Sequence, residues 1–117
     1  MSKPISKSVL TEPQVRLVEL LQQLNFGRIE GLRIRGGEPV FDPAPRVVRK
    51  LKMGADNAPR PEADLEDFWL KRPTIEMLET IAHLGDGQIL SIDVKHGLPF
   101  ALEVEHATEL VGGESRE

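Results

Sequence analysis

Cysteine and tyrosine are absent from this sequence of 117 residues, and its aromatic side chains are four phenylalanines and one tryptophan. Without cysteine the chain cannot form disulfides or thiolate metal sites. We expect a core of Leu, Ile and Val with a few aromatic plugs. No apolar run approaches the roughly 20 residues that span a bilayer, and residues 1–10 lack the apolar stretch of a signal peptide. These absences predict a cytoplasmic protein without membrane contact.

A large excess of positive charge is also missing, because the formal net charge is −4. A dedicated nucleic-acid-binding protein usually carries a basic excess, so this balance argues against one while leaving room for a local basic patch. The length fits a single domain. We place that domain at residues 9–107, between polar tails at residues 1–8 and 108–117 that we expect to be flexible.

An internal repeat is the main positive feature of the sequence. Residues 13–41 align without a gap on residues 73–101, at an offset of 60. Ordinary composition would give about two identities by chance over such a length. The alignment has seven identities in 29 positions, namely Pro13/Pro73, Glu19/Glu79, Leu24/Leu84, Gly27/Gly87, Ile29/Ile89, Gly37/Gly97 and Pro39/Pro99.

Each repeat begins with a predicted helix. Apolar residues recur at helical spacing between residues 15 and 24 and again between residues 75 and 84. Thr11 and Gln14 have the spacing of a capping box at the start of the first helix. Gly27 and Gly87 are expected to end the helices or to lie just past them.

Each predicted helix is followed by a predicted hairpin. Two-residue turns are expected at Gly36-Gly37 and at His96-Gly97. Alternation of apolar and polar residues indicates strands. In the second copy it predicts that Leu90, Ile92 and Val94 share one face before the turn, and that Phe100, Leu102 and Val104 share one face after it. In the first copy the return strand is cut short by the prolines of residues 42–45.

The predicted fold class is α+β, with duplicated αββ units. A two-stranded hairpin alone is marginal in water. Two units can join their hairpins into a four-stranded antiparallel sheet, with two helices on one face and a pseudo-twofold axis between the halves. The order of the strands does not follow from the sequence.

A proline-rich connector, residues 42–72, joins the two copies. Its stretch from Val47 to Met53 fits a short strand and one helical turn equally well. At its end, Leu65, Phe68, Trp69 and Leu70 are expected to form an apolar clamp that leads into the second helix. Trp69 either packs against the core or the start of the second helix, or serves as a surface hot spot for a partner.

The stretch from residue 20 to residue 40 resembles a small bacterial domain called YezD-like. That family has a short helix, an aromatic-Gly step, a strand, a glycine-containing turn and a return strand. Phe26-Gly27 supplies the step here, and Gly37 supplies the turn. The second copy has Asp86 where the aromatic residue should stand. Since the family's domains are single copies, the resemblance implies that this chain fuses two of them; the family has no function to carry over.

No catalytic or metal-binding pattern is present in the sequence. The histidines His83, His96 and His106 have no metal-ligand spacing. The acidic residues of 62–67 lie on the connector, where a solvated role is expected. No phosphate-binding loop of Walker or Rossmann type and no nucleophile elbow occur. We therefore expect no enzyme activity and no cofactor; a small enzyme or metal-binding protein is the weakest alternative.

The function predicted from the sequence is a non-catalytic interaction module. Its contact surface would be the free face of the sheet or an exposed edge strand, with an unknown protein partner or self-association. Nucleic-acid association through a basic patch is the alternative. The candidate surface residues are Arg33, Arg35, Arg46, Arg49, Lys50, Lys52, Trp69, Asp93 and Lys95.

Overall fold

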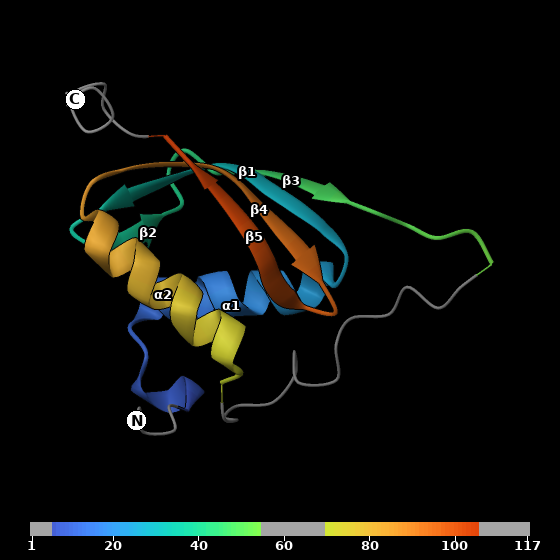
Figure 1. Cartoon of the computed structure of the whole chain (residues 1–117), viewed down its shortest axis with the longest axis horizontal. Helices are drawn as coiled ribbons and strands as arrows, with labels where there is room; N and C mark the ends of the chain where they lie inside the picture. The colour runs from blue at the N-terminus through green and yellow to red at the C-terminus, as the bar shows by residue number, and fades with distance from the viewer. Residues whose placement is uncertain (1–5, 55–69, 106–117) are drawn as a thin grey trace, which may run out of the picture.

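The structure is a computed structural model that describes residues 6–54 and 70–105 (Figure 1). Two α-helices lie on one face of an antiparallel sheet, which confirms the predicted α+β class. No helix of the two described ranges is long and apolar enough to cross a membrane. The elements are η1 (Lys7–Val9), α1 (Glu12–Leu24), β1 (Gly27–Arg35), β2 (Glu38–Val40), β3 (Arg46–Arg49), α2 (Arg72–Leu84), β4 (Gly87–Lys95) and β5 (Leu98–Val104).

The two helices have equal lengths of 13 residues and similar ends. α1 begins with the predicted capping box: the N–H of Gln14 donates to the Thr11 hydroxyl at 3.4 Å, and the Thr11 N–H donates to the Gln14 side-chain oxygen at 2.9 Å. These bonds satisfy two backbone donors at the helix start. Both helices end at a residue with positive φ, Asn25 in α1 and Gly85 in α2. Gly27 and Gly87 then open the strands that follow the two helices.

The sheet has five strands, in place of the four predicted. Four of them follow the order β2-β1-β4-β5, and β3 pairs with β1 beside β2. β2 has three residues and pairs only with the end of β1, from Arg33 to Arg35. β3 pairs with the beginning of β1, from Gly27 opposite Arg49 to Glu30 opposite Arg46. The connector supplies this extra strand because the short β2 leaves the first half of that edge without backbone partners.

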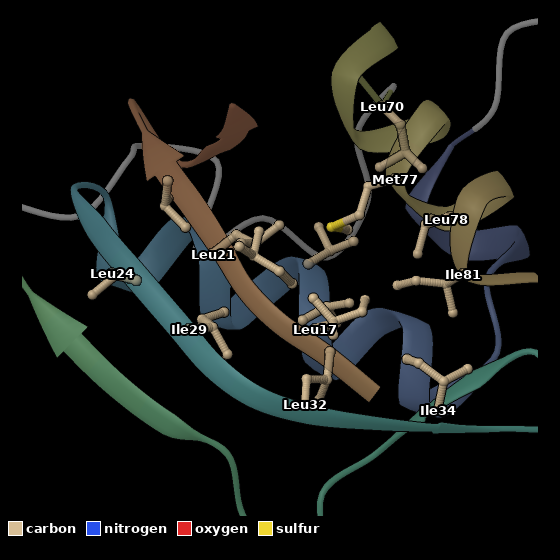
Figure 2. Packing of buried hydrophobic residues seen from close by; sticks show 14 residues of the cluster. Leu17, Leu21, Leu24, Ile29, Leu32, Ile34, Leu70, Met77, Leu78 and Ile81 are labelled. Atoms are coloured by element: carbon tan, nitrogen blue, oxygen red, sulfur yellow. The ribbon is translucent and has the colours of Figure 1, made fainter. Parts of the chain in front are cut away.

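The hydrophobic core lies between the helices and the sheet (Figure 2). Ile29 and Leu32 of β1 point toward Leu17 and Leu21 of α1 and are fully buried. The core is aliphatic apart from Met77, and it contains none of the described phenylalanines. The prediction that aromatic side chains fill part of the core is therefore wrong for these residues. The cluster consists of Leu17, Val18, Leu21, Leu24, Ile29, Leu32, Ile34, Leu70, Met77, Leu78, Ile81, Ile89, Ile92 and Val94, with Phe41 only packed against it.

Two segments beside the helices also pack against the body of the fold. Leu70, the last residue of the predicted apolar clamp, is buried in the core. Leu65, Phe68 and Trp69 lie outside the described residues. Before α1, the Lys7 side chain is 5% exposed, and its ammonium lies 2.7 Å from the Glu19 carboxylate. This ion pair ties η1 to α1.

A bulge in β4 changes which apolar residues face the core. Ile89 lies opposite Val104 of β5, but Ser91 lies opposite Glu103, so Leu90 is the extra residue. A bulge shifts the alternation of side chains by one position. Ile89 is therefore fully buried and Leu90 is 44% exposed. The prediction that Leu90 shares the face of Ile92 and Val94 is wrong for this reason.

Candidate functional site

An open groove of about 740 Å³ lies at one end of the sheet, where β1 begins, β3 ends and β4 turns into β5. Most of its lining belongs to the outer face of the sheet, which neither α1 nor α2 covers (Figure 1). The charged and aromatic residues of the lining are Phe26, Arg28, Arg49, Lys50, Lys52, Asp93, Lys95, His96 and Phe100. We call this site the Phe–Lys groove, after Phe26, Lys50, Lys52, Lys95 and Phe100.

Strand register brings these residues together from distant parts of the chain. Arg28 of β1 lies opposite Val48 of β3 on one side and opposite Asp93 of β4 on the other. One step beyond β3, the Lys50 N–H donates to the Phe26 carbonyl at 2.9 Å. Residues directly opposite one another in an antiparallel pair point to the same face of the sheet. The ladder therefore places Lys50 beside Phe26.

Phe100 reaches the groove through a second bulge. Asp93 pairs with Ala101 and Val94 pairs with Pro99, so Phe100 is the extra residue of β5. A bulge can turn a side chain away from the face that strict alternation would give it. The Phe100 side chain is 67% exposed, and the Lys95 ammonium lies 4.3 Å from its ring centroid. The prediction that Phe100 shares the face of Leu102 and Val104 is wrong because it did not include this bulge.

Phe26 forms the opposite aromatic wall of the groove. Its ring meets the His96 ring edge-on, with 4.8 Å between the centroids and an angle of 69°. The turn that carries His96 is held in place because the Gly97 N–H donates to the Asn25 carbonyl at 2.9 Å. The Lys52 ammonium lies 5.1 Å from the Phe26 centroid. Each phenyl ring of the groove thus has a lysine ammonium over its face.

The arginines in and beside the groove have hydrogen-bond or ion-pair partners within the protein. The guanidinium of Arg28 donates to the Glu30 carboxylate at 2.6 Å, and Arg46 approaches the other oxygen of Glu30 at 3.6 Å. The hydrogen bond with Glu30 raises the pKa of Arg28, and the same bond lowers the pKa of Glu30. Arg49 donates to the Gln23 carbonyl near the end of α1 at 3.2 Å.

Lys50 and Lys95 are exposed and supply positive charge that faces solvent. In the described part of the chain, no salt bridge reaches Lys50 or Lys95. Asp93 is the one acidic residue of the described lining, and its charge acts on Arg28 from across the strand pair. The groove therefore combines three ammonium groups with two partly accessible phenyl rings.

The structure gathers some of the predicted surface residues and separates others. Arg49, Lys50, Lys52, Asp93 and Lys95 all line the groove. Arg33 and Arg35 lie at the far end of β1, opposite Val40 and Glu38 of β2. Arg46 is held by Glu30. Trp69 lies outside the described residues.

Four charged or aromatic residues of the groove were missing from the sequence-based surface: Phe26, Arg28, His96 and Phe100. Phe26 does carry a signal, because it stands in the aromatic-Gly step between helix and strand. Phe100 carries none, since nothing in the residues around it marks the bulge that turns its ring outward.

The histidines of the described ranges are engaged separately. His83 lies in the last turn of α2, with its Nδ1 2.8 Å from the Glu79 carbonyl oxygen. His96 contacts Phe26, while His106 lies outside the described residues. Asp86 accepts a hydrogen bond from the Gly36 N–H at 2.8 Å. Over residues 6–54 and 70–105, no group of three or more His, Asp or Glu side chains is arranged to hold a metal ion.

Comparison with known proteins finds no relative of this chain. No family model matches the chain, and no match is found among curated proteins or among solved structures. Functional inference therefore rests on the groove itself.

Proposed function

We propose that this protein is a non-catalytic binding module that holds a negatively charged partner in the Phe–Lys groove. The observation that carries the proposal is the meeting of Lys50, Lys52 and Lys95 on an open sheet face, beside one carboxylate that already faces an arginine. Clustered charge of one sign attracts an oppositely charged ligand even on a protein whose net charge is negative.

The exposed phenyl ring of Phe100 supports a binding role. The core is closed without it, since the helices and sheet bury an aliphatic cluster that contains no phenylalanine. Exposed aromatic side chains are favoured at contact sites. The paired strands β1, β3, β4 and β5 hold the groove on a backbone framework, which limits the ordering cost of binding.

Titration with a short inorganic polyphosphate, followed by NMR on the isotope-labelled full chain, tests this proposal. We expect the amide signals of Lys50, Lys95 and Gly97 to shift together. Lys95→Gln should weaken binding about fivefold at 0.1 M salt, as expected for the loss of one phosphate contact. Lys71→Gln is the matched control, because Lys71 is exposed at the start of α2. Shifts spread over the helices, or equal effects of both variants, would contradict the proposal.

We also infer that the fold arose by duplication of one αββ unit of the YezD-like type, with a pseudo-twofold axis between β1 and β4. Both helices and both long strands recur at the offset of 60. Ile29 pairs with Ile92 and Leu32 pairs with Ile89, so replacing each residue by its counterpart at the offset of 60 turns the first pair into the second. The turns make reciprocal bonds as well, from Gly37 N–H to the Gly85 carbonyl and from Gly97 N–H to the Asn25 carbonyl.

A further inference from the structure

The two lysine–phenylalanine pairs of the groove suit a ligand that has both negative charge and flat apolar faces. Lys95 lies over Phe100 and Lys52 lies over Phe26. The Lys95 ammonium is held weakly, because the Phe100 ring beneath it is exposed to solvent. It can therefore leave the ring for a phosphate while a flat group takes its place on the ring face.

We propose that the ligand of the Phe–Lys groove is single-stranded nucleic acid. A base stacks on Phe100, and Lys50, Lys52 and Lys95 contact the neighbouring phosphates. This inference rests on the proposed function and names the chemistry of the partner. Base stacking on aromatic side chains, combined with a cationic groove along the backbone, is the general means by which proteins bind single strands.

The strand must be single because bases in a duplex are already stacked on one another and present only their edges. The groove presents the faces of phenyl rings, and these cannot recognise the hydrogen-bonding pattern along the edges of base pairs. An acidic peptide would satisfy the lysines, but its carboxylates have no flat face to place on Phe100. The geometry therefore favours a nucleic acid over an acidic protein partner.

Sequence composition alone argued against this ligand, because the net charge is negative and the phenylalanines were expected in the core. The groove differs from the whole chain in both its aromatic residues and its charge. Phe100 is 67% exposed, and Phe26 lines the same groove. The Glu30 carboxylate forms ion pairs with Arg28 and Arg46 and not with the lysines.

Fluorescence anisotropy of the full chain with a labelled oligouridine tests the inference, with an abasic oligonucleotide of the same length as the probe that keeps phosphates and lacks bases. We expect the oligouridine to bind at least fivefold more tightly than the abasic strand, the lower end of the effect of one base–aromatic stack. Three phosphate contacts predict a slope of about −2 for log affinity against log salt, since each contact on a single strand contributes about 0.7.

Phe100→Ala separates stacking from charge. It should remove the preference for the oligouridine and leave binding of the abasic strand unchanged. Leu90→Ala is the matched control, because Leu90 is also an exposed apolar bulge residue but does not line the groove. Thermal unfolding followed by circular dichroism checks that both variants fold.

The outcomes distinguish the two proposals. Equal binding of both strands, with no effect of Phe100→Ala, overturns the nucleic-acid inference and leaves the anion-binding module standing. Tighter binding of an oligoglutamate than of the oligouridine also overturns it, in favour of an acidic protein partner. Absence of binding to polyphosphate and to both strands overturns both proposals.

Discussion

Gly27→Ala tests how β3 is attached to the sheet and what that attachment does for the groove. A Cβ added at Gly27 would lie 2.0 Å from the backbone carbonyl oxygen of Val48 and 3.0 Å from the Cα of Arg49. The φ of Gly27 is +148°, a value that L side chains rarely adopt. Because the obstacle is backbone, no side-chain rotation relieves it, and β3 must move away from β1.

The expected cost follows from the two effects together. Forcing an extra carbon into a packed site usually costs about 1–3 kcal/mol, and holding a residue in a sparsely populated backbone region costs about the same. Release of β3 relieves the first cost, so we expect the free energy of unfolding to fall by about 1–3 kcal/mol. The core between the helices and β1, β4 and β5 contains no β3 residue and should stay intact.

Two assays measure the result. Chemical denaturation gives the free energy of unfolding, and hydrogen exchange followed by NMR reports the Lys50 amide, which donates to Phe26 next to the β1–β3 ladder. We expect faster exchange at Lys50 and unchanged exchange at the β1–β4 pairs. Polyphosphate affinity should fall as well, because Lys50 and Lys52 follow β3 and lose their place in the groove.

Gly31→Ala is the matched control in the same strand. Gly31 also has a positive φ, +72°, but the nearest atom to its added Cβ is the Gln88 side-chain nitrogen at 3.6 Å. The control variant therefore has backbone strain without the clash and should keep Lys50 protected. If Gly27→Ala leaves both stability and Lys50 exchange like those of the control, the close approach of β3 is not what requires glycine at position 27.

Two further predictions concern charge and chain division. Glu30→Gln should strengthen binding of the abasic oligonucleotide about fivefold at 0.1 M salt, as expected for one additional phosphate contact. The reason is that Arg28 and Arg46 lose the carboxylate with which they form ion pairs. Glu79→Gln on α2 is the control, because it makes the same change in net charge and should have no effect on binding. Since the hydrogen bond from Arg28 lowers the pKa of Glu30, the carboxylate stays charged to lower pH than usual, and the wild-type affinity should rise only below the ordinary glutamate pKa. Cutting the chain between residues 56 and 62 should give fragments that fold only when mixed or dimerised, as sedimentation and circular dichroism can show; a monomeric, folded half would refute the shared core.

The local structure was largely predictable from the sequence. The apolar spacing of each copy, the capping box at Thr11 and the turn at His96-Gly97 each depend on residues close together in the chain, and each is found in the structure. The residues of the central strands were also placed correctly apart from Leu90. Such features follow from backbone preferences and side-chain periodicity, which act over a few residues.

The strand count and the two bulges could not be predicted in this way. The sequence of residues 47–53 fits a strand and a helical turn equally, and only the unpaired edge of β1 makes the strand the better solution. The bulges at Leu90 and Phe100 accommodate the register between β4 and β5. A register depends on both strands at once, so neither strand alone reveals it.

The amino-acid sequence by itself determined the α+β composition of this protein, the presence of a helix followed by a hairpin on either side of residues 42–72, and the predominance of Leu, Ile and Val in its core, because these depend on residue type and local spacing. Only the tertiary structure decided where the Phe–Lys groove lies. Phe26, Lys50 and Phe100 are far apart in the chain and meet because β3 and β4 pair with opposite edges of β1 while a bulge turns Phe100 outward. Backbone pairing between distant segments is what sets those positions.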